Sequence, residues 1–156
     1  MDGRFIIRSC TAEDIDSLWE LEKICFDTDS WSRGFFENIQ KDSSYILLCV
    51  QDLQMAKIVG YSVFYGAFDQ GDLANIAVLP DCRGLGIGKA LLEETMKKAF
   101  DTGVSQVFLE VRESNSAARG LYLSSGFAEI GKRRNYYNSP REDAILLMRE
   151  LGSSNL

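Results

Sequence analysis

Histidine is absent from this chain of 156 residues. The absence excludes every catalytic device that pairs a serine or a cysteine with a histidine base. It also removes the usual nitrogen ligand of metal sites, and the cysteines include no Cys-x-x-Cys pair that could replace it. We expect free buried thiols, no bound metal, and acid–base chemistry that uses carboxylates, tyrosine, lysine or cysteine. The four cysteines are Cys10, Cys25, Cys49 and Cys82.

Long apolar runs and an excess of basic residues are also missing. No stretch approaches the roughly 20 apolar residues that cross a bilayer, and residues 1–4 lack the layout of a secretion signal. We therefore expect a cytoplasmic protein without membrane contact. The formal net charge is -6, whereas phosphate contacts need clustered Lys and Arg, so we expect no direct nucleic-acid partner. An acidic surface would suit a basic protein partner.

The length predicts a single domain over residues 1–150, with a frayed tail at 151–156. Apolar periodicity, caps and turn residues predict its elements. The predicted strands cover 4–9, 45–50, 58–64, 73–79, 104–111, 127–136 and 143–149, and the helices cover 12–25, 33–40, 85–101 and about 116–126. The strand at 104–111 is almost continuously apolar and should be buried on both faces.

A glycine-rich loop, Arg83-Gly84-Leu85-Gly86-Ile87-Gly88-Lys89, lies between a predicted strand and the strongest predicted helix. Unpaired N–H groups and the positive end of the helix dipole attract anions at such a position, which predicts a phosphate-bearing ligand. A Walker loop is disfavoured because Ala90 follows Lys89, and a dinucleotide loop because Lys89 replaces its third glycine. A structural turn without a ligand is the alternative.

The remaining pattern, [QR]-x-x-G-x-[GA], resembles the pyrophosphate loop of the GNAT acetyltransferases. Further segments follow in the order and spacing of its RimI-like branch, the protein N-terminal acetyltransferases. The closing segments are similar to those of ribosomal-protein alanine N-acetyltransferases, and the resemblance covers about residues 4 to 150. These segments are Asn75–Val78, Leu109–Asn115, Leu121–Tyr122, Ser125–Phe127, Arg133–Tyr137 and Arg141–Ala144.

The resemblance implies an α/β (α+β) fold and a cosubstrate. The sheet would be mixed, mostly antiparallel and bent, with six or seven strands and about four helices on both faces. Acetyl-CoA would enter a V-shaped split between the fourth and fifth strands. The Val78 N–H would polarise the thioester carbonyl. The implied acetyl-CoA contacts are Ile76, Ala77, Val78, Arg83, Gly84, Leu85, Gly86, Ile87, Gly88, Lys89 and Asn115, the last of which could also cap a helix.

Two residues are candidates for the catalytic groups. Glu110 interrupts an apolar run and should be partly desolvated, and the resemblance implies that it is the general base, acting through water. Its alternative is a strand end that faces solvent or an arginine. The resemblance implies that Tyr122 protonates the departing thiolate, whereas an isolated tyrosine would more often pack in the core.

The acceptor is predicted to be an N-terminal α-amine. At pH 7 about a tenth of α-amino groups are neutral and able to attack, against fewer than about one lysine in a thousand. The resemblance implies direct attack in a ternary complex by the N-terminal alanine of a small-subunit ribosomal protein. Trp31, Tyr136 and Tyr137 are expected to contact this acceptor.

Several points stay open at this level. The basic segment 132–141 could cover the acceptor, bind the 3′-phosphate of CoA, or be a solvated hairpin. An acetyltransferase of a small amine or antibiotic is the first alternative function, and a non-catalytic acyl-CoA sensor is the second. We expect a monomer or a weak dimer.

Overall fold

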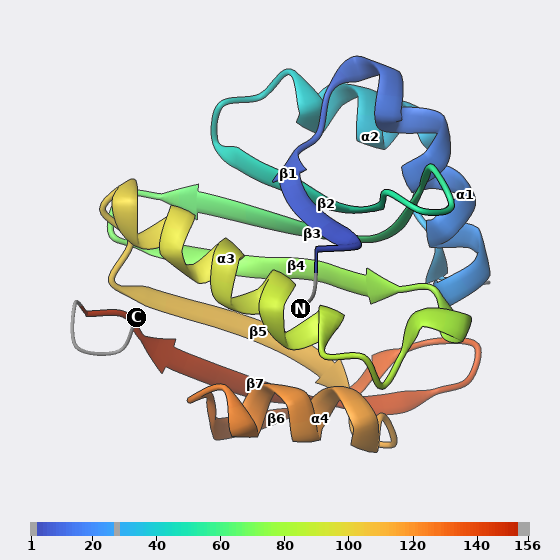
Figure 1. Ribbon diagram of the computed structural model, residues 1–156. Helices are drawn as coiled ribbons and strands as arrows, with labels where there is room; N and C mark the ends of the chain where they lie inside the picture. Colours follow the sequence, from blue (N-terminus) through green and yellow to red (C-terminus); the bar gives the residue numbers. More distant parts are fainter. Residues whose placement is uncertain (1–2, 27–28, 153–156) are drawn as a thin grey trace.

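The computed structural model describes residues 3–26 and 29–152 (Figure 1). Two 3-10 turns, η1 (Ala12–Asp14) and η3 (Pro80–Cys82), accompany the strands and helices. In chain order these are β1 (Phe5–Ser9), α1 (Ile15–Phe26), α2 (Arg33–Gln40), β2 (Tyr45–Asp52), β3 (Lys57–Ala67), β4 (Gln70–Val78), α3 (Ile87–Asp101), β5 (Gln106–Arg112), α4 (Ser116–Ser124), β6 (Ala128–Tyr137) and β7 (Glu142–Glu150). No helix of these described ranges is long and apolar enough to cross a membrane.

The strands form a seven-stranded sheet in the order β1-β2-β3-β4-β5-β7-β6. Every neighbouring pair is antiparallel except β4 and β5, which run parallel and are connected through α3. A tight hairpin reverses the direction of the chain, so it can join only antiparallel strands. A parallel pair therefore needs a longer crossover connection. The predicted mixed, mostly antiparallel sheet is confirmed.

The sheet splits between β4 and β5. The two strands pair only where Gln70–Asp72 lies opposite Gln106–Phe108. Toward their carboxyl ends they diverge, and Figure 1 shows the gap opening beside the first turn of α3. The predicted V-shaped split between the fourth and fifth strands is therefore present.

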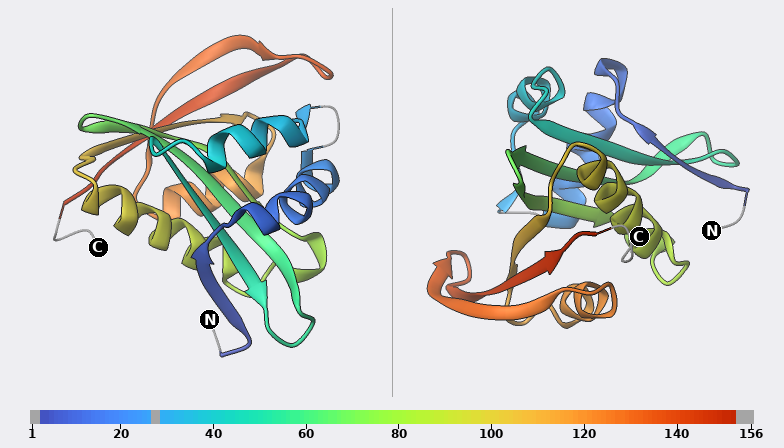
Figure 2. Two further views of the ribbon diagram at one scale, coloured as in Figure 1. Left: turned by 90° about the horizontal axis from the view of Figure 1, so that it is seen from above. Right: turned by 90° about the vertical axis from the view of Figure 1, so that its left-hand side faces the viewer.

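Helices cover both faces of the sheet (Figure 2). Side chains alternate along each strand, so neighbouring residues of β2 enter different cores. Leu47 and Cys49 pack with α1 and α2, whereas Leu48 and Val50 pack with α3. A third cluster joins α3 and α4 to β4, β5 and β7. The predicted arrangement of helices on both faces is confirmed.

Three local predictions need correction: the starts of two helices and the burial of β5. The helix predicted from residue 12 starts at Ile15, because Asp14 turns back to accept a hydrogen bond from the Thr11 N–H at 2.8 Å and closes η1 instead. The helix predicted from residue 85 starts at Ile87, because Gly86 has a φ of 81°, outside the helical region.

The prediction that β5 is buried on both faces is wrong. Its burial alternates: Val107, Leu109 and Val111 lie in the α3–α4 core, while Phe108 and Glu110 are only half-buried. The face of β5 that carries Phe108 and Glu110 is not covered by a helix along its whole length, and it lines a pocket instead. At the chain end, Leu151 packs in the same core, and residues 153–156 of the predicted tail lie outside the described residues.

Candidate active site

The glycine loop enters α3 with its amides exposed. Gly84 and Gly86 have φ angles of 80° and 81°, and a Cβ atom on either would meet no atom within 4 Å. Across the described residues, no acceptor is recorded for the N–H groups of residues 84–89. These donors stand at the positive end of a helix of 15 residues. The geometry suits the predicted anion site.

The side chains of the loop contribute unequally. Ile87 is buried against β2 and β3, so its side chain is not available to a ligand. Arg83 turns back toward β4, where its Nε donates to the Val78 carbonyl at 3.0 Å. Leu85 and Lys89 are exposed. Arg83 therefore anchors the loop to β4.

The edge of β4 that faces the split carries main-chain N–H groups that do not pair with β3. The Leu79 N–H donates to the Val59 carbonyl at 2.8 Å, so Leu79 is turned toward β3. Since hydrogen-bonding direction alternates along an antiparallel strand, Ala77 also faces β3 while Ile76 and Val78 face the split. Of the three residues in the predicted pantetheine contact, only Ile76 and Val78 direct their N–H groups that way.

A pocket of about 550 Å³ lies at the split. Asp72 is in register with Phe108, and Glu110 is two residues further along β5, so all three side chains share one face of the sheet. Trp31, before α2, and the β6 residues Tyr136 and Tyr137 form part of its wall. The full lining is Trp31, Asp72, Leu73, Ala74, Phe108, Leu109, Glu110, Ile130, Arg133, Tyr136, Tyr137, Leu146 and Leu147.

Glu110 is the carboxylate at the centre of this lining. Its side chain is 28% exposed, in agreement with the predicted partial desolvation, and the Arg133 Nε lies 3.6 Å from its Oε1. Tyr136 hydrogen-bonds to the same carboxylate, which raises the pKa of Tyr136. Glu110 thus meets both descriptions offered by the sequence, a partly buried acid and an acid that faces an arginine.

Tyr122 approaches from the other side of the sheet. It lies in the α3–α4 core, 7% exposed, with its ring edge-on to Phe127 at 5.8 Å between centroids. Burial raises its pKa, so the hydroxyl keeps its proton at neutral pH. Tyr122 does not line the pocket, so the structure does not place it beside Glu110, and its predicted proton transfer stays a prediction.

Asp72 was not singled out in the sequence, and Arg133 was considered only as part of the basic segment 132–141 and of the family-like segment Arg133–Tyr137. Burial and then the charge of Glu110 raise the pKa of Asp72, and Arg133 opposes that shift. Alternation along β4 could have placed Asp72 on the face opposite the buried Gly71 and Leu73. Its proximity to Glu110 depends on the β4–β5 register, which no local pattern encodes.

A buried carboxylate holds the wall that carries Trp31. Glu22 of α1 is fully buried and accepts hydrogen bonds from the Trp31 N–H at 2.7 Å and from Asn75 Nδ2 at 2.9 Å. The Tyr61 hydroxyl donates a third. Burial raises the pKa of Glu22.

Elsewhere, the Asn115 side chain accepts from the Ala118 N–H at 3.2 Å, which confirms its predicted role as the cap of α4.

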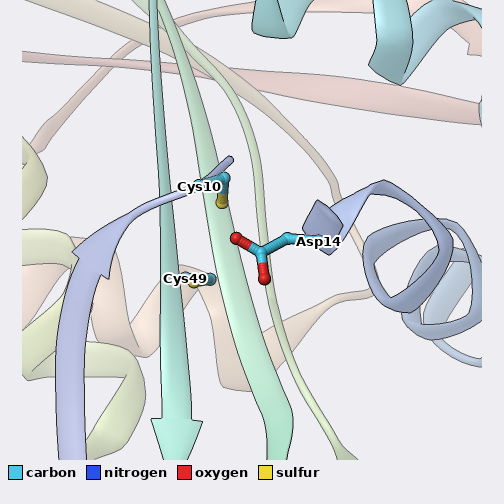
Figure 3. Close-up of side chains that lie close together, drawn as sticks. All are labelled: Cys10, Asp14 and Cys49. Atoms are coloured by element: carbon cyan, nitrogen blue, oxygen red, sulfur yellow. The ribbon is translucent and has the colours of Figure 1, made fainter. Parts of the chain in front are cut away.

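One group of possible metal ligands lies away from the pocket. Ligand atoms of Cys10, Asp14 and Cys49 are within 4.8 Å of one another (Figure 3). The Asp14 carboxylate, however, accepts two hydrogen bonds from the Arg8 guanidinium, at 2.7 and 2.9 Å. This neighbouring cation lowers the pKa of Asp14 and repels a divalent ion, so the contacts support a structural role.

Comparison with known proteins identifies the architecture. A family model described as the acetyltransferase (GNAT) family matches residues 13–127. The chain belongs to the GNAT acetyltransferases. It is therefore an acetyltransferase, as its glycine loop and split sheet predicted.

Individual GNAT relatives extend the comparison. A ribosomal protein bS18-alanine N-acetyltransferase of Haemophilus influenzae is 37% identical over 91% of this chain and 96% of its own. The crystal structure of the ribosomal-protein-S18-alanine N-acetyltransferase from Escherichia coli superposes with a TM-score of 0.85, at 33% identity over 97% of this chain and 98% of the other.

A GNAT family acetyltransferase from Elizabethkingia anophelis, solved with acetyl-CoA bound, shares the fold at a TM-score of 0.78 and 23% identity, over 96% of this chain and all of the other.

Proposed function

We propose that this enzyme transfers the acetyl group of acetyl-CoA to the N-terminal α-amine of a protein, and that its acceptor is the alanine that begins ribosomal protein bS18. The observation that carries the proposal is the pocket at the β4–β5 split, where Glu110 faces a wall of Trp31, Tyr136 and Tyr137. Relatives that act on bS18 share this architecture over most of the chain.

The glycine loop would hold the diphosphate of acetyl-CoA through the free N–H groups of residues 84–89. The N–H groups of Ile76 and Val78, which face the split, would bind the pantetheine arm and the thioester carbonyl. A carbonyl oxygen that becomes negative during attack is stabilised most by such preorganised main-chain donors. The bound acetyl group supplies the electrophilic carbon.

The amine nitrogen attacks that carbon directly, forming the C–N bond as the C–S bond breaks. The amine loses a proton to Glu110, and the leaving thiolate takes a proton from the Tyr122 hydroxyl. The Tyr122 hydroxyl carries the proton that this step needs, because a tyrosine side chain is protonated at neutral pH. Since Glu110 and Tyr122 belong to opposite faces of the sheet, they can serve the two ends of the reaction through the split.

The charge of the pocket favours an amine acceptor. Asp72 and Glu110 lie on one face, and a protonated amine arriving there meets two carboxylates against one guanidinium, that of Arg133. A protein that modifies a ribosomal component works in the cytoplasm, and we place this enzyme there, as a monomer or weak dimer.

A mass-spectrometric acceptor screen tests the proposal. Peptides that begin with Ala, Ser, Met or acetyl-blocked Ala are incubated with the enzyme and acetyl-CoA, beside a polyamine and an aminoglycoside. We expect the Ala peptide to gain 42 Da, a single acetyl group, and the blocked peptide to remain unchanged. Faster acetylation of either small amine would favour the small-amine alternative, and no CoA release with any acceptor would favour the acyl-CoA sensor.

A further inference from the structure

Arg112 ends β5 inside the segment Leu109–Asn115 that resembles the family, and the proposed chemistry assigns it no role. Its side chain is 19% exposed. Neither Arg112 nor its partner Asp29 is among the described residues that line the pocket. Any effect of Arg112 on the reaction must therefore pass through the residues it holds.

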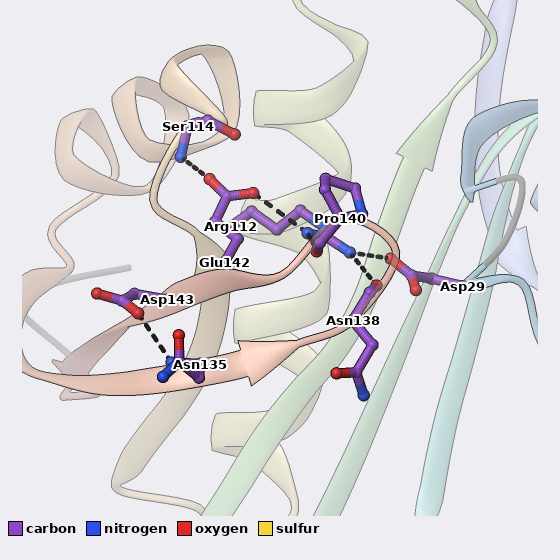
Figure 4. Close-up of polar contacts among 8 residues, drawn as sticks. All are labelled: Asp29, Arg112, Ser114, Asn135, Asn138, Pro140, Glu142 and Asp143. Carbon is purple, nitrogen blue, oxygen red and sulfur yellow. Dashed lines mark hydrogen bonds and ion pairs between the residues drawn. The ribbon is translucent and has the colours of Figure 1, made fainter.

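The guanidinium joins three separate parts of the chain (Figure 4). Its Nη2 donates to Asp29 Oδ2, in the segment between α1 and α2, at 2.7 Å. In the β6–β7 turn, Nη2 also donates to the Asn138 carbonyl at 3.2 Å, and Nη1 to the Pro140 carbonyl at 2.9 Å. At the start of β7, Nη1 donates to Glu142 at 3.2 Å.

The other contacts fix this arrangement. Glu142 accepts a second hydrogen bond, at 2.6 Å, from the Ser114 N–H, so it ties β7 to the segment after β5. The Arg112 guanidinium lies over the Tyr137 ring at 4.4 Å from its centroid, a cation–π contact. One arginine thus forms ion pairs with both Asp29 and Glu142.

The parts that Arg112 joins carry residues that line the acceptor pocket from two separate segments of the chain. Asp29 lies two residues before Trp31, and Tyr137 and Asn138 belong to the hairpin that also supplies Tyr136. Trp31 is already tied to α1 through Glu22, so the Asp29–Arg112 ion pair is a second attachment, from this wall to the hairpin.

We propose that Arg112 is a positioning residue for the acceptor: through Asp29 and the β6–β7 turn it clamps Trp31 and Tyr137 at the separation that fits the N-terminal segment of the acceptor protein. The role of this clamp in acceptor binding rests on the proposed function. It predicts that acceptor affinity depends on the ion pair while acetyl-CoA affinity does not, because the glycine loop makes no contact with it.

The test compares Asp29→Asn with Asp16→Asn. Both substitutions remove a carboxylate charge from an ion pair with an arginine, but the Asp16–Arg33 pair does not involve Arg112, and neither of its residues is among those that line the pocket. A partly exposed pair contributes modestly, so we expect the KM for an Ala peptide to rise about threefold to fivefold in Asp29→Asn. The kcat and the acetyl-CoA Kd should stay within about twofold of wild type.

Two further measurements separate positioning from general destabilisation. Arg112→Lys cannot serve four acceptors or cover the Tyr137 ring, so its KM should rise more than about tenfold, and adding Asp29→Asn should change it little. At about 1 M salt, where the Debye length falls to about 3 Å, the gap between wild type and Asp29→Asn should narrow. A variant that merely folds poorly would not show this dependence.

Hydrogen exchange provides a readout that needs no acceptor. In Asp29→Asn, amides of residues 29–32 and 137–139 should exchange faster than in Asp16→Asn. Unchanged exchange together with an unchanged KM would overturn the clamp, as would an acetyl-CoA Kd that rises as much as the KM. If wild-type enzyme acetylates no peptide, the proposed function fails, and the exchange measurement alone then decides whether the clamp exists.

Discussion

Replacing Gly86 by alanine tests whether the glycine loop is built for a ligand or for the fold. Gly86 has a φ of 81°, where a side chain is strained, but an added Cβ would meet nothing within 4 Å. The stability cost is therefore the backbone strain alone, about 1 to 2 kcal/mol. In a domain of this size that lowers the Tm by roughly 2 to 8 °C.

The effect on coenzyme A should be larger. A methyl group on the open side of Gly86 stands where the diphosphate would approach, and each charge-assisted hydrogen bond lost costs about 1.5 to 3 kcal/mol. Calorimetry should then give a Kd at least about tenfold above that of wild type.

Gly103→Ala is the matched control. Gly103 has a φ of 99° and equally open space at its Cβ position, but it follows the other end of α3, about 22 Å away along the helix. It should lose similar stability and bind coenzyme A as wild type does. Equal affinity in wild type and both variants, or equal weakening in both variants, would refute the assignment of the loop.

Three further predictions concern catalysis and stability. Glu110→Gln and Tyr122→Phe should each lower kcat by about 10² to 10⁴-fold with acetyl-CoA affinity retained in calorimetry, and near-normal turnover would remove that residue from the mechanism. Glu22→Ala should cost roughly 3 kcal/mol in urea unfolding because one buried and two partly buried donors lose their acceptor, whereas Glu20→Ala on the exposed face of α1 should cost less than about 0.5 kcal/mol; similar losses would contradict the stabilising role of the Glu22 network. Arg4 lowers the pKa of Asp52 to about 2, below its unfolded value, so the stability advantage of wild type over Asp52→Asn should be complete above about pH 4 and disappear as the pH falls through about 2; an advantage that persists in acid would refute it.

Local features of the sequence predicted the elements that position the cosubstrate. Gly84 and Gly86 signalled the turn into α3 because only glycine adopts their φ angles without strain, and Asn115 signalled the start of α4 because its side chain can cap. Both features depend only on residues that are close to one another in the sequence. The same is true of the strand, helix and strand that form the crossover.

The acceptor side depends on contacts that no local pattern records. Asp72 meets Glu110 because β4 and β5 pair over three residues, and Arg112 reaches Asp29 across 83 positions of the chain. The error on β5 has the same origin. Its apolar run predicted two covered faces, but the second face lines the pocket because the sheet splits there.

The most direct test of the account is to locate the acetyl group on a peptide that begins with alanine and carries one internal lysine. Tandem mass spectrometry after incubation with acetyl-CoA should find it on the alanine α-amine, and Glu110→Gln should abolish most of that product within the same time. Acetylation of the lysine instead would contradict the proposed transfer to a protein N-terminus, and equal product with Glu110→Gln would contradict the proposed role of Glu110.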